Sequence, residues 1–486
     1  MGPTPPAGGV RRPGQRAAPR QGGPPQLTSG AATAGPDAAP SRRARESPRS
    51  RPEPGRARNR GPRPLHRVAW SRSDAPAALL CDVRSNSRSS AASRPPRGRR
   101  PPGGLRAGRG AASGREVHVS VPIDGSVEPR FAAVRDVLAD LVETGKETGA
   151  GVSVWHRGRE VVGLSAGWTD AARSRPWRRD TLVNVFSVGK PLAALAALVA
   201  FARRKVDLDT PVARLWPDYA AAGKERTTLR QMLAHQAGQP AFPASAAGVG
   251  ALDDAGLRAA LAAAAPEHRP GAGVAEHALT YGHLLDGAVR GAVGVPLAGV
   301  FAETVPERPG SGLWFGVPEE SLHRVADLEV GTPHWTADYL ADPDSLPARA
   351  LTVPHGVLHT GFLNSTAWRR ASFPAVGLHA SASALGAFYA SLTDGEGPVA
   401  RLLGPALHAE YLSPQARGVD GFVGRDTVWT LGFQRDDESV GMGGIGGSAA
   451  WWSFRHGYAL AYLTRRMADH SRVAAIADEV EKALGA

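Results

Sequence analysis

The feature that most constrains the fold of this chain is an abrupt change in composition near residue 117. Residues 1–116 contain 24 arginines, no lysine and 6 acidic residues, which gives a formal charge of +18. Aromatic and β-branched residues are rare there, so this segment cannot bury enough apolar surface to offset the entropy lost on ordering. We therefore expect a disordered leader over residues 1–116 and one folded domain over residues 117–486.

The charge of the chain has to be assigned to these two parts separately. The whole sequence carries a formal charge of +13 and has a pI near 10.5, values typical of proteins that bind nucleic acid. The folded part by itself carries a charge of −5. Nucleic acid is therefore not an expected partner of the domain, and the arginines of the leader, which occur without lysine, do not favour that function either.

The sequence also bears on location and on metal binding. Cys81 is the only cysteine, which excludes an intramolecular disulfide and disfavours a cysteine-based metal site. The longest apolar run, Pro191–Ala202, is shorter than the ~20 residues that a membrane helix needs. No apolar segment near the first residue resembles a signal peptide. We expect a cytoplasmic protein with no membrane association and no cofactor.

Apolar spacing predicts strands near both ends of the domain and helices between them. Residues 149–155 and 160–167 alternate like a hairpin, and residues 448–454 and 458–464 are similar strands near the C-terminus. Helices are predicted over 131–142, 187–204, 227–235 (with Thr227 as N-cap), 252–264, 279–290, 382–392 and 473–484, and a further strand over 427–435. This order predicts an α+β fold: one antiparallel sheet from both chain ends, flanked by helices, with a mostly helical insertion.

The segment Ser187-Val-Gly-Lys190 is a candidate catalytic motif. A serine hydroxyl is a weak nucleophile until a nearby base accepts its proton. Positions i and i+3 share one face of a helix, so this lysine can reach the hydroxyl. A helix N-terminus also stabilises an oxyanion and lowers the pKa of a lysine, whose neutral form accepts a proton. The alternative interpretation is an ordinary serine and lysine at the start of a core helix.

Three segments around this motif carry a family resemblance. Residues Trp177–Lys190 resemble the nucleophile segment of the serine β-lactamase-related family, which includes class C β-lactamases, D-alanyl-D-alanine carboxypeptidases and family VIII esterases. Leu208–Pro217 and Leu229–Gly238 are similar to further family segments, in the family order. The resemblance implies a β-lactamase/transpeptidase-like fold over nearly all of 117–486. It also implies that Ser187 is the acylated nucleophile and Lys190 its base.

The second family motif departs from the pattern. The family's catalytic tyrosine opens a stretch that here begins with Glu276-His-Ala-Leu-Thr-Tyr-Gly, so Glu276 stands at the tyrosine position. A carboxylate with a pKa near ~4.3 can accept a proton but does not readily return one to a leaving group. Tyr281 follows five residues later, more than one helical turn away, and is a weaker candidate for the missing tyrosine. A glutamate exposed at a helix start is the alternative interpretation of Glu276.

The third family motif is a strand normally opened by Lys-Thr-Gly, His-Gly-Gly or Trp-Gly-Gly. Here Met442-Gly443-Gly444-Ile445 resembles it, with Met442 at the first position. Glycines let backbone approach a ligand closely. The resemblance implies that the Ile445 N–H is an oxyanion donor beside that of Ser187. A lysine that would pair with a substrate carboxylate is missing, so Met442 argues against recognition of a β-lactam or of a peptidoglycan-peptide carboxylate.

Two other patterns imitate functional motifs. Gly163-Leu-Ser165-Ala-Gly matches the G-x-S-x-G nucleophile elbow, but that elbow needs a strand-to-helix turn and this stretch is predicted inside a hairpin strand. His355 and His359 have the spacing of a zinc-binding helix. Gly356 stands where such a site needs a glutamate, and Pro354 precedes the pair. We therefore expect no metal site.

Two functions remain open from the sequence. The first is a serine hydrolase that forms an acyl-enzyme with a small ester or amide, esterase-like rather than a true β-lactamase. The second is a catalytically impaired protein of the same fold that binds a ligand or partner in the old cleft, because Glu276 and Met442 depart from the family pattern. Labelling of Ser187 by a fluorophosphonate probe would favour the first.

Deletion of residues 1–116 is predicted to cost neither stability nor activity, because the segment has the composition of disorder. Its arginine, proline, glycine, alanine and serine content is also typical of translated GC-rich non-coding sequence, so we expect native translation to start near Val117. Melting temperature compares the two forms, and the intact mass of protein from its native source locates the start. A mass matching all 486 residues would contradict the start site. Salt-sensitive DNA binding by that form would restore the nucleic-acid hypothesis.

Overall fold

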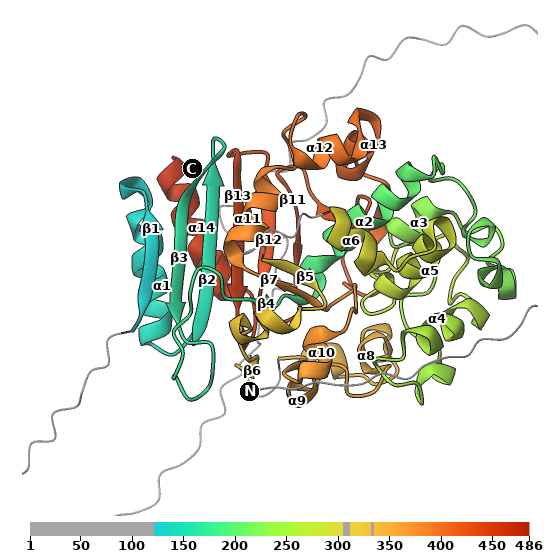
Figure 1. Ribbon diagram of the computed structural model, residues 1–486, viewed down its shortest axis with the longest axis horizontal. Helices are drawn as coiled ribbons and strands as arrows, with labels where there is room; N and C mark the ends of the chain where they lie inside the picture. Colours follow the sequence, from blue (N-terminus) through green and yellow to red (C-terminus); the bar gives the residue numbers. More distant parts are fainter. Residues whose placement is uncertain (1–120, 305–311, 332–334, 486) are drawn as a thin grey trace, which may run out of the picture. The chain divides into compact units, whose positions relative to one another are not determined.

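A computed structural model describes residues 121–304, 312–331 and 335–485 of the chain. The predicted leader, Cys81 and the expected start at Val117 lie outside these residues. Within them the protein is built on a nine-stranded antiparallel sheet with helices packed on both faces (Figure 1). The predicted α+β class is confirmed.

The strand order across this sheet joins the two ends of the domain. From one edge to the other the sheet comprises β1 (Ile123–Val127), β3 (Arg159–Gly167), β2 (Gly149–His156), β13 (Tyr458–Thr464), β12 (Ala449–Ser453), β11 (Ser439–Gly443), β10 (Gln434–Arg435), β9 (Asp426–Trp429) and β8 (Ala416–Val419). β2 pairs with β13, with Val154 opposite Leu460. The hairpin from the start of the domain and the strands from its end therefore form one sheet, as predicted.

Alternating side chains along β13 bury both faces of the sheet. Leu460 packs in a core with α1 (Ala132–Glu143) and α14 (Ser471–Leu484), whereas Ala461, the next residue, packs in the core that contains α11 (Ala382–Ala390). Successive residues of a strand point to opposite faces. A strand buried on both faces is apolar at every position, which explains the continuous apolar run in the sequence.

The predicted helical insertion lies between β3 and α11 in the chain. It comprises β4 (Val183–Asn184), α2 (Lys190–Arg203), α3 (Leu229–Leu233), α4 (Asp254–Ala263), α5 (Tyr281–Val293), α6 (Leu297–Thr304), β5 (Leu313–Phe315), β6 (Glu329–Val330), α7 (Ala337–Leu340), α8 (Leu346–Thr352), α9 (Thr360–Leu363), α10 (Thr366–Arg370) and β7 (Leu378–Ala380). β4, β7 and β5 form a small antiparallel sheet, and β6 pairs with β14 (Arg466–Met467). α12 (Pro398–Leu403) and α13 (Pro405–Leu412) connect α11 to β8.

Helix α2 is the central helix of the insertion. Residues Lys190–Phe201 are all buried, so the helix is apolar around its whole circumference, as a helix enclosed in a core must be. The segment Phe186–Arg203 is long and apolar enough to cross a membrane, but 89% of it is buried inside the protein. Its hydrophobicity is therefore explained by packing in the core.

Two predicted elements differ from the structure. The strand predicted over 427–435 is a hairpin: β9 ends at Trp429, β10 begins at Gln434, and Gly432 takes a φ of +112° between them. A residue other than glycine rarely adopts that conformation, so the glycine turns the chain where apolar spacing alone predicted continuity. The N-cap of α3 is Thr228 rather than Thr227, because the Thr228 hydroxyl accepts the N–H of Gln231.

Several histidines are buried in the core of the domain, among them His235, His277, His283 and His379. Burial lowers the pKa of His277 and His379 to about 3 and that of His283 to about 4, and it also lowers the pKa of His235. These rings stay neutral in the folded state at a pH where the same rings are protonated in the unfolded chain. Protons bound by the unfolded state alone reduce stability.

The free energy of unfolding is therefore predicted to fall as the pH drops from 6.5 toward about 4. Each such histidine should cost about 1.4 kcal/mol at about pH 5.5, one unit below its unfolded pKa. Urea unfolding at about pH 7.5 and about pH 5.5 measures the loss. His379→Gln should reduce the loss, and substitution of the exposed His323 by glutamine should leave it unchanged. Equal stability at both pH values would contradict the prediction.

Candidate active site

Three side chains from two segments meet at the centre of the domain. Lys190 Nζ lies 2.6 Å from Ser187 Oγ, and Glu276 Oε1 lies 2.9 Å from Lys190 Nζ and 3.3 Å from Ser187 Oγ. All three residues are buried. The structure thus brings together the predicted nucleophile, its lysine and the glutamate at the family's tyrosine position, and the alternative of an exposed Glu276 is wrong.

The nucleophile segment has an unusual backbone. Ser187 lies in a 3-10 helical turn, Phe186–Gly189, that leads directly into α2. Phe186, the residue before the serine, takes a φ of +52°, a conformation that side chains other than glycine seldom adopt. Strain of this kind is concentrated at functional sites, where surrounding packing maintains it. The i, i+3 spacing then puts Lys190 beside the hydroxyl, as predicted.

The Lys190 ammonium is fully buried but has all its hydrogens engaged. Its Nζ donates to Ser187 Oγ and to the Ala278 carbonyl oxygen, 3.1 Å away, and forms the ion pair with Glu276. An ammonium group has three hydrogens, and these three oxygens can accept all of them. Burial lowers the pKa of Lys190, and the charge of Glu276 opposes that shift. The hydroxyl hydrogen of Ser187 is then directed to the Glu276 carboxylate.

Glu276 is held in place by Asp420, a residue that the sequence did not single out. The Asp420 carboxylate is fully buried and accepts the backbone N–H of Glu276 at 3.0 Å. It also accepts the N–H groups of Phe422 and Val423 at 2.8 and 2.9 Å, and the Trp429 indole N–H at 2.8 Å. A buried carboxylate with four donors is well compensated. Asp420 therefore joins the loop before β9 to Glu276.

The turn between β11 and β12 lies against the nucleophile segment. A Cβ added to Gly444 would lie 2.4 Å from the Val185 carbonyl oxygen, and one added to Gly446 would lie 2.8 Å from the Phe186 ring. Gly447 has a φ of +96° at the end of this turn. Glycine is required for both the turn and the close approach. These constraints bring the Ile445 backbone to the same cleft as Ser187.

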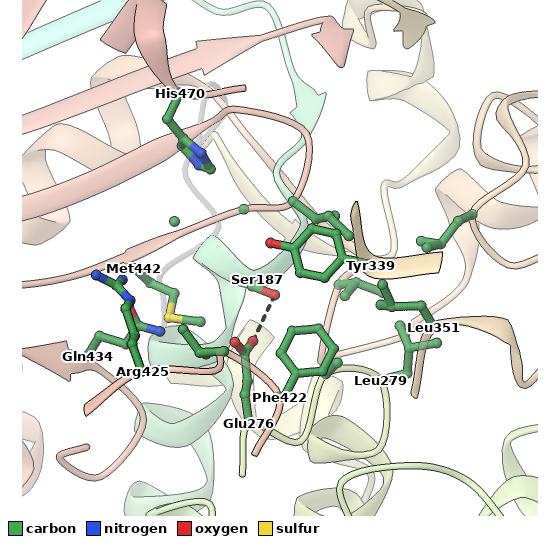
Figure 2. Close-up of a pocket in the computed structure, with 17 residues that line it drawn as sticks. Ser187, Glu276, Leu279, Tyr339, Leu351, Phe422, Arg425, Gln434, Met442 and His470 are labelled. Atoms are coloured by element: carbon green, nitrogen blue, oxygen red, sulfur yellow. Dashed lines mark hydrogen bonds between the residues drawn. The ribbon is translucent and has the colours of Figure 1, made fainter. Parts of the chain in front are cut away.

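The cleft that contains Ser187 has walls of different character. Figure 2 shows Met442, Arg425 and Gln434 to one side of Ser187 and Glu276, and aromatic and aliphatic side chains to the other. The apolar part of the lining comprises Ala278, Leu279, Tyr339, Leu351, Leu358, Val376, Phe422, Val423 and Ile445. Predominantly apolar clefts with a few polar groups are typical of small-molecule sites.

All four residues predicted for the third motif line the cleft: Met442, Gly443, Gly444 and Ile445. Met442 is almost completely buried and packs with Trp429 in a small core. The thioether therefore has a packing role. It supplies no charge to the cleft.

Other sequence candidates lie outside this arrangement. Tyr281 is buried in α5, where its hydroxyl donates to the Leu233 carbonyl oxygen, so it does not replace the missing tyrosine. Ser165 lies within β3, opposite Gly151 of β2, with no strand-to-helix turn. His355 lies in a turn and His359 caps the short α9, so they do not share a helix face. Within residues 121–304, 312–331 and 335–485, no cluster of three or more metal-ligating side chains occurs.

Comparison with known sequences identifies similar proteins. The family model described as Beta-lactamase matches residues 134–484. The chain is 34% identical over 206 residues to Esterase/beta-lactamase LipL of Mycobacterium tuberculosis, across 42% of this chain and 48% of LipL. The chain thus spans about half the length of that relative.

Two solved structures resemble the domain over the whole of their length. A novel penicillin-binding protein homologue from Caulobacter crescentus superposes with a TM-score of 0.65 and 29% identity, covering 74% of this chain and 100% of the homologue. A family VIII carboxylesterase superposes with a TM-score of 0.64 and 28% identity, with the same coverage of 74% and 100%. The family resemblance and the β-lactamase/transpeptidase-like fold inferred from the sequence are confirmed.

The buried ion pair predicts strong energetic coupling between Lys190 and Glu276. Lys190→Met or Glu276→Gln should each lower the free energy of unfolding by about 3–5 kcal/mol, because either leaves its partner's charge buried without compensation. The double variant should lose much less than the sum of the two losses. Urea unfolding of the four proteins measures this coupling.

A second lysine–glutamate pair provides the control. Lys482 and Glu479 are 2.7 Å apart on the exposed side of α14, where water screens the charges. The same cycle there should show little coupling. Additive losses at Lys190 and Glu276 would show that the two buried charges do not stabilise one another.

Proposed function

The chain belongs to the beta-lactamase family, and we propose that it is a serine hydrolase that cleaves a small ester through an acyl-enzyme. The observation that carries this proposal is the contact of the Ser187 hydroxyl with both an ammonium and a carboxylate in a buried cleft. Esterases among the similar proteins support the same reaction class, and we extend it to this chain as a proposal.

In the first half of the reaction, Glu276 accepts the proton of Ser187. The serine oxygen attacks the ester carbonyl carbon and forms a tetrahedral intermediate with a negative oxygen. Lys190, which donates to Ser187 Oγ, stabilises the negative charge that develops on the serine as its proton leaves. This assignment differs from the family expectation, in which the lysine is the base. Here Glu276 is the proton acceptor and Lys190 is the cation beside it.

The oxyanion of the intermediate needs donors aimed at its position. The backbone N–H groups of Ser187 and Ile445 are proposed for this role, because both residues line the cleft and backbone donors do not depend on the side chain at position 442. The positive end of the helical turn at Ser187 adds to this stabilisation.

Collapse of the intermediate completes acylation. The bond to the alcohol oxygen breaks, the alcohol takes the proton held by Glu276, and the acyl group remains on Ser187. In deacylation Glu276 accepts a proton from water, the hydroxide attacks the acyl carbonyl, and the Ser187 oxygen leaves with the proton. Ester and water are thus converted to acid and alcohol. An alcohol is a better leaving group than an amine, which favours an ester over an amide for a site with a carboxylic acid as its proton donor.

The alternative, a non-catalytic protein that binds a ligand in the cleft, is not favoured. An impaired site would be expected to have lost contact between nucleophile and proton acceptor. Glu276 instead lies within 3.3 Å of the hydroxyl, and Asp420 holds its backbone. Small-molecule substrates are the partners that follow from this function.

The test uses a fluorophosphonate probe and a set of short acyl esters with the full chain. Ser187→Ala is predicted to abolish labelling and to lower turnover by about four orders of magnitude or more, while the protein still folds. Ser165→Ala is the matched control, since that serine matches another motif, and it should retain both. Turnover that survives in Ser187→Ala, or a wild-type protein that neither labels nor hydrolyses any ester, would refute the proposal.

A further inference from the structure

A cation on the polar wall of the cleft has no partner among the described residues. Arg425 lines the cleft directly before β9, and its guanidinium makes no ion pair or hydrogen bond with any other described residue. The side-chain amide of Gln434, at the start of β10, also lines the cleft and has no described partner. Figure 2 shows both on the Met442 side of Ser187.

The other ionisable groups of the cleft do not compensate Arg425. The Glu276 carboxylate is paired with Lys190 behind it, so that pair has no net charge. His470 lines the cleft as well, and burial lowers its pKa to about 4, which leaves the ring neutral near pH 7. Among the described lining residues, Arg425 is therefore the charged side chain that has no ion-pair partner.

The position of Arg425 is fixed by the loop that carries it. Asp420 N–H donates to the Arg425 carbonyl oxygen at 2.9 Å, and Gly424, at a φ of +77°, donates to the Asp420 carbonyl oxygen at 2.8 Å. The same Asp420 carboxylate accepts the Glu276 N–H at 3.0 Å. The backbone of Asp420 therefore positions the Arg425 backbone, and the carboxylate of the same residue positions Glu276. A rigid support of this kind is what a recognition group needs to act with precision.

The opposite wall of the cleft has a different chemistry. Tyr339 and Phe422 stack with ring centroids 5.7 Å apart, and Leu351 and Leu279 lie on the same side of Ser187 in Figure 2. A ligand whose scissile carbonyl lies at Ser187 would thus face the Arg425 cation at one end and apolar side chains of the protein at the other.

We propose that Arg425 and Gln434 form a carboxylate-binding subsite, so that the preferred substrate is an ester with a carboxylate on one side of the scissile carbonyl and an apolar group on the other. A planar guanidinium binds both oxygens of a carboxylate, and the Gln434 amide adds a neutral donor. An arginine that has no ion-pair partner among the described residues matches an anionic group on a ligand. This inference rests on the proposed hydrolase function and specifies its substrate class.

The subsite is compatible with the absence of a lysine at position 442. Met442 removes one possible partner for a substrate carboxylate, and the sequence argument against carboxylate recognition depended on that residue. Arg425 comes from the loop before β9, so it would hold the anion in a different place relative to Ser187. Discrimination for acidic esters is then expected without the lysine of the family motif.

Two matched pairs of esters test the subsite in the full chain. The first is 3-butanoyloxybenzoate and its methyl ester, with the carboxylate on the alcohol side. The second is mono-4-nitrophenyl adipate and its methyl ester, with the carboxylate on the acyl side. The wild-type protein should prefer the acid of at least one pair by about tenfold or more in kcat/KM, the effect of a charge-assisted hydrogen bond. In Arg425→Gln the ratio should fall to near one.

Arg417→Gln is the control, because Arg417 lies on the neighbouring β8, is exposed, and pairs with Asp426 outside the cleft. This variant should retain the preference for the acid.

Hydrolysis of the methyl esters with no preference for either acid would overturn the subsite and leave the proposed function intact. If no ester is hydrolysed, the proposed function fails, and calorimetric binding of both pairs to Ser187→Ala still decides the subsite. Tighter binding of an acid that Arg425→Gln abolishes supports it, and equal binding overturns it.

Discussion

The buried ammonium group of Lys190 is the constraint around which the centre of this domain is arranged. A charge removed from water is costly unless its partners replace the lost hydration. Lys190 has three such partners, two of which are Ser187 Oγ and the Glu276 carboxylate. Any arrangement that satisfies the lysine therefore also brings the serine hydroxyl into contact with a proton acceptor. The same contacts of Lys190 therefore stabilise the core and position the Ser187 hydroxyl.

Glutamate at the position of the family's tyrosine changes the charge of the centre as well as its acid–base chemistry. A tyrosine beside Lys190 would be neutral or would share a proton with it, whereas Glu276 supplies a full negative charge in a buried place. The serine, lysine and glutamate together are then neutral. For that reason Ser187, Lys190 and Glu276 together do not offset the charge of Arg425, which lines the same cleft.

The walls of the cleft are placed mainly by contacts with backbone groups rather than by contacts between side chains. Asp420 connects Glu276 to the loop before β9 through hydrogen bonds to backbone N–H groups. Gly444 and Gly446 allow the turn after β11 to touch the backbone before Ser187. Segments that are 144 residues apart in one case and 259 in the other are thus held together by contacts with the backbone. Backbone contacts limit which side chains fit at these points. The remaining side chains of the cleft are then free to set substrate specificity.

The sequence by itself determined the fold class, the strand pairing of the two chain ends, and the identity of Ser187 and Lys190. The strands and helices follow from local periodicity, the spacing of three residues marks Ser187 and Lys190 as a pair, and the resemblance to the serine β-lactamase-related family implies their roles. It also identified Glu276 as a departure from the family, but whether that carboxylate is exposed or paired depends on a contact across 86 residues of chain. The tertiary structure alone decided that contact, the hairpin at Gly432, and the positions of Asp420 and Arg425 beside the cleft. These features leave no periodic pattern in the sequence. Each depends on which distant segment packs at that place and replaces the contacts that polar groups would otherwise make with water.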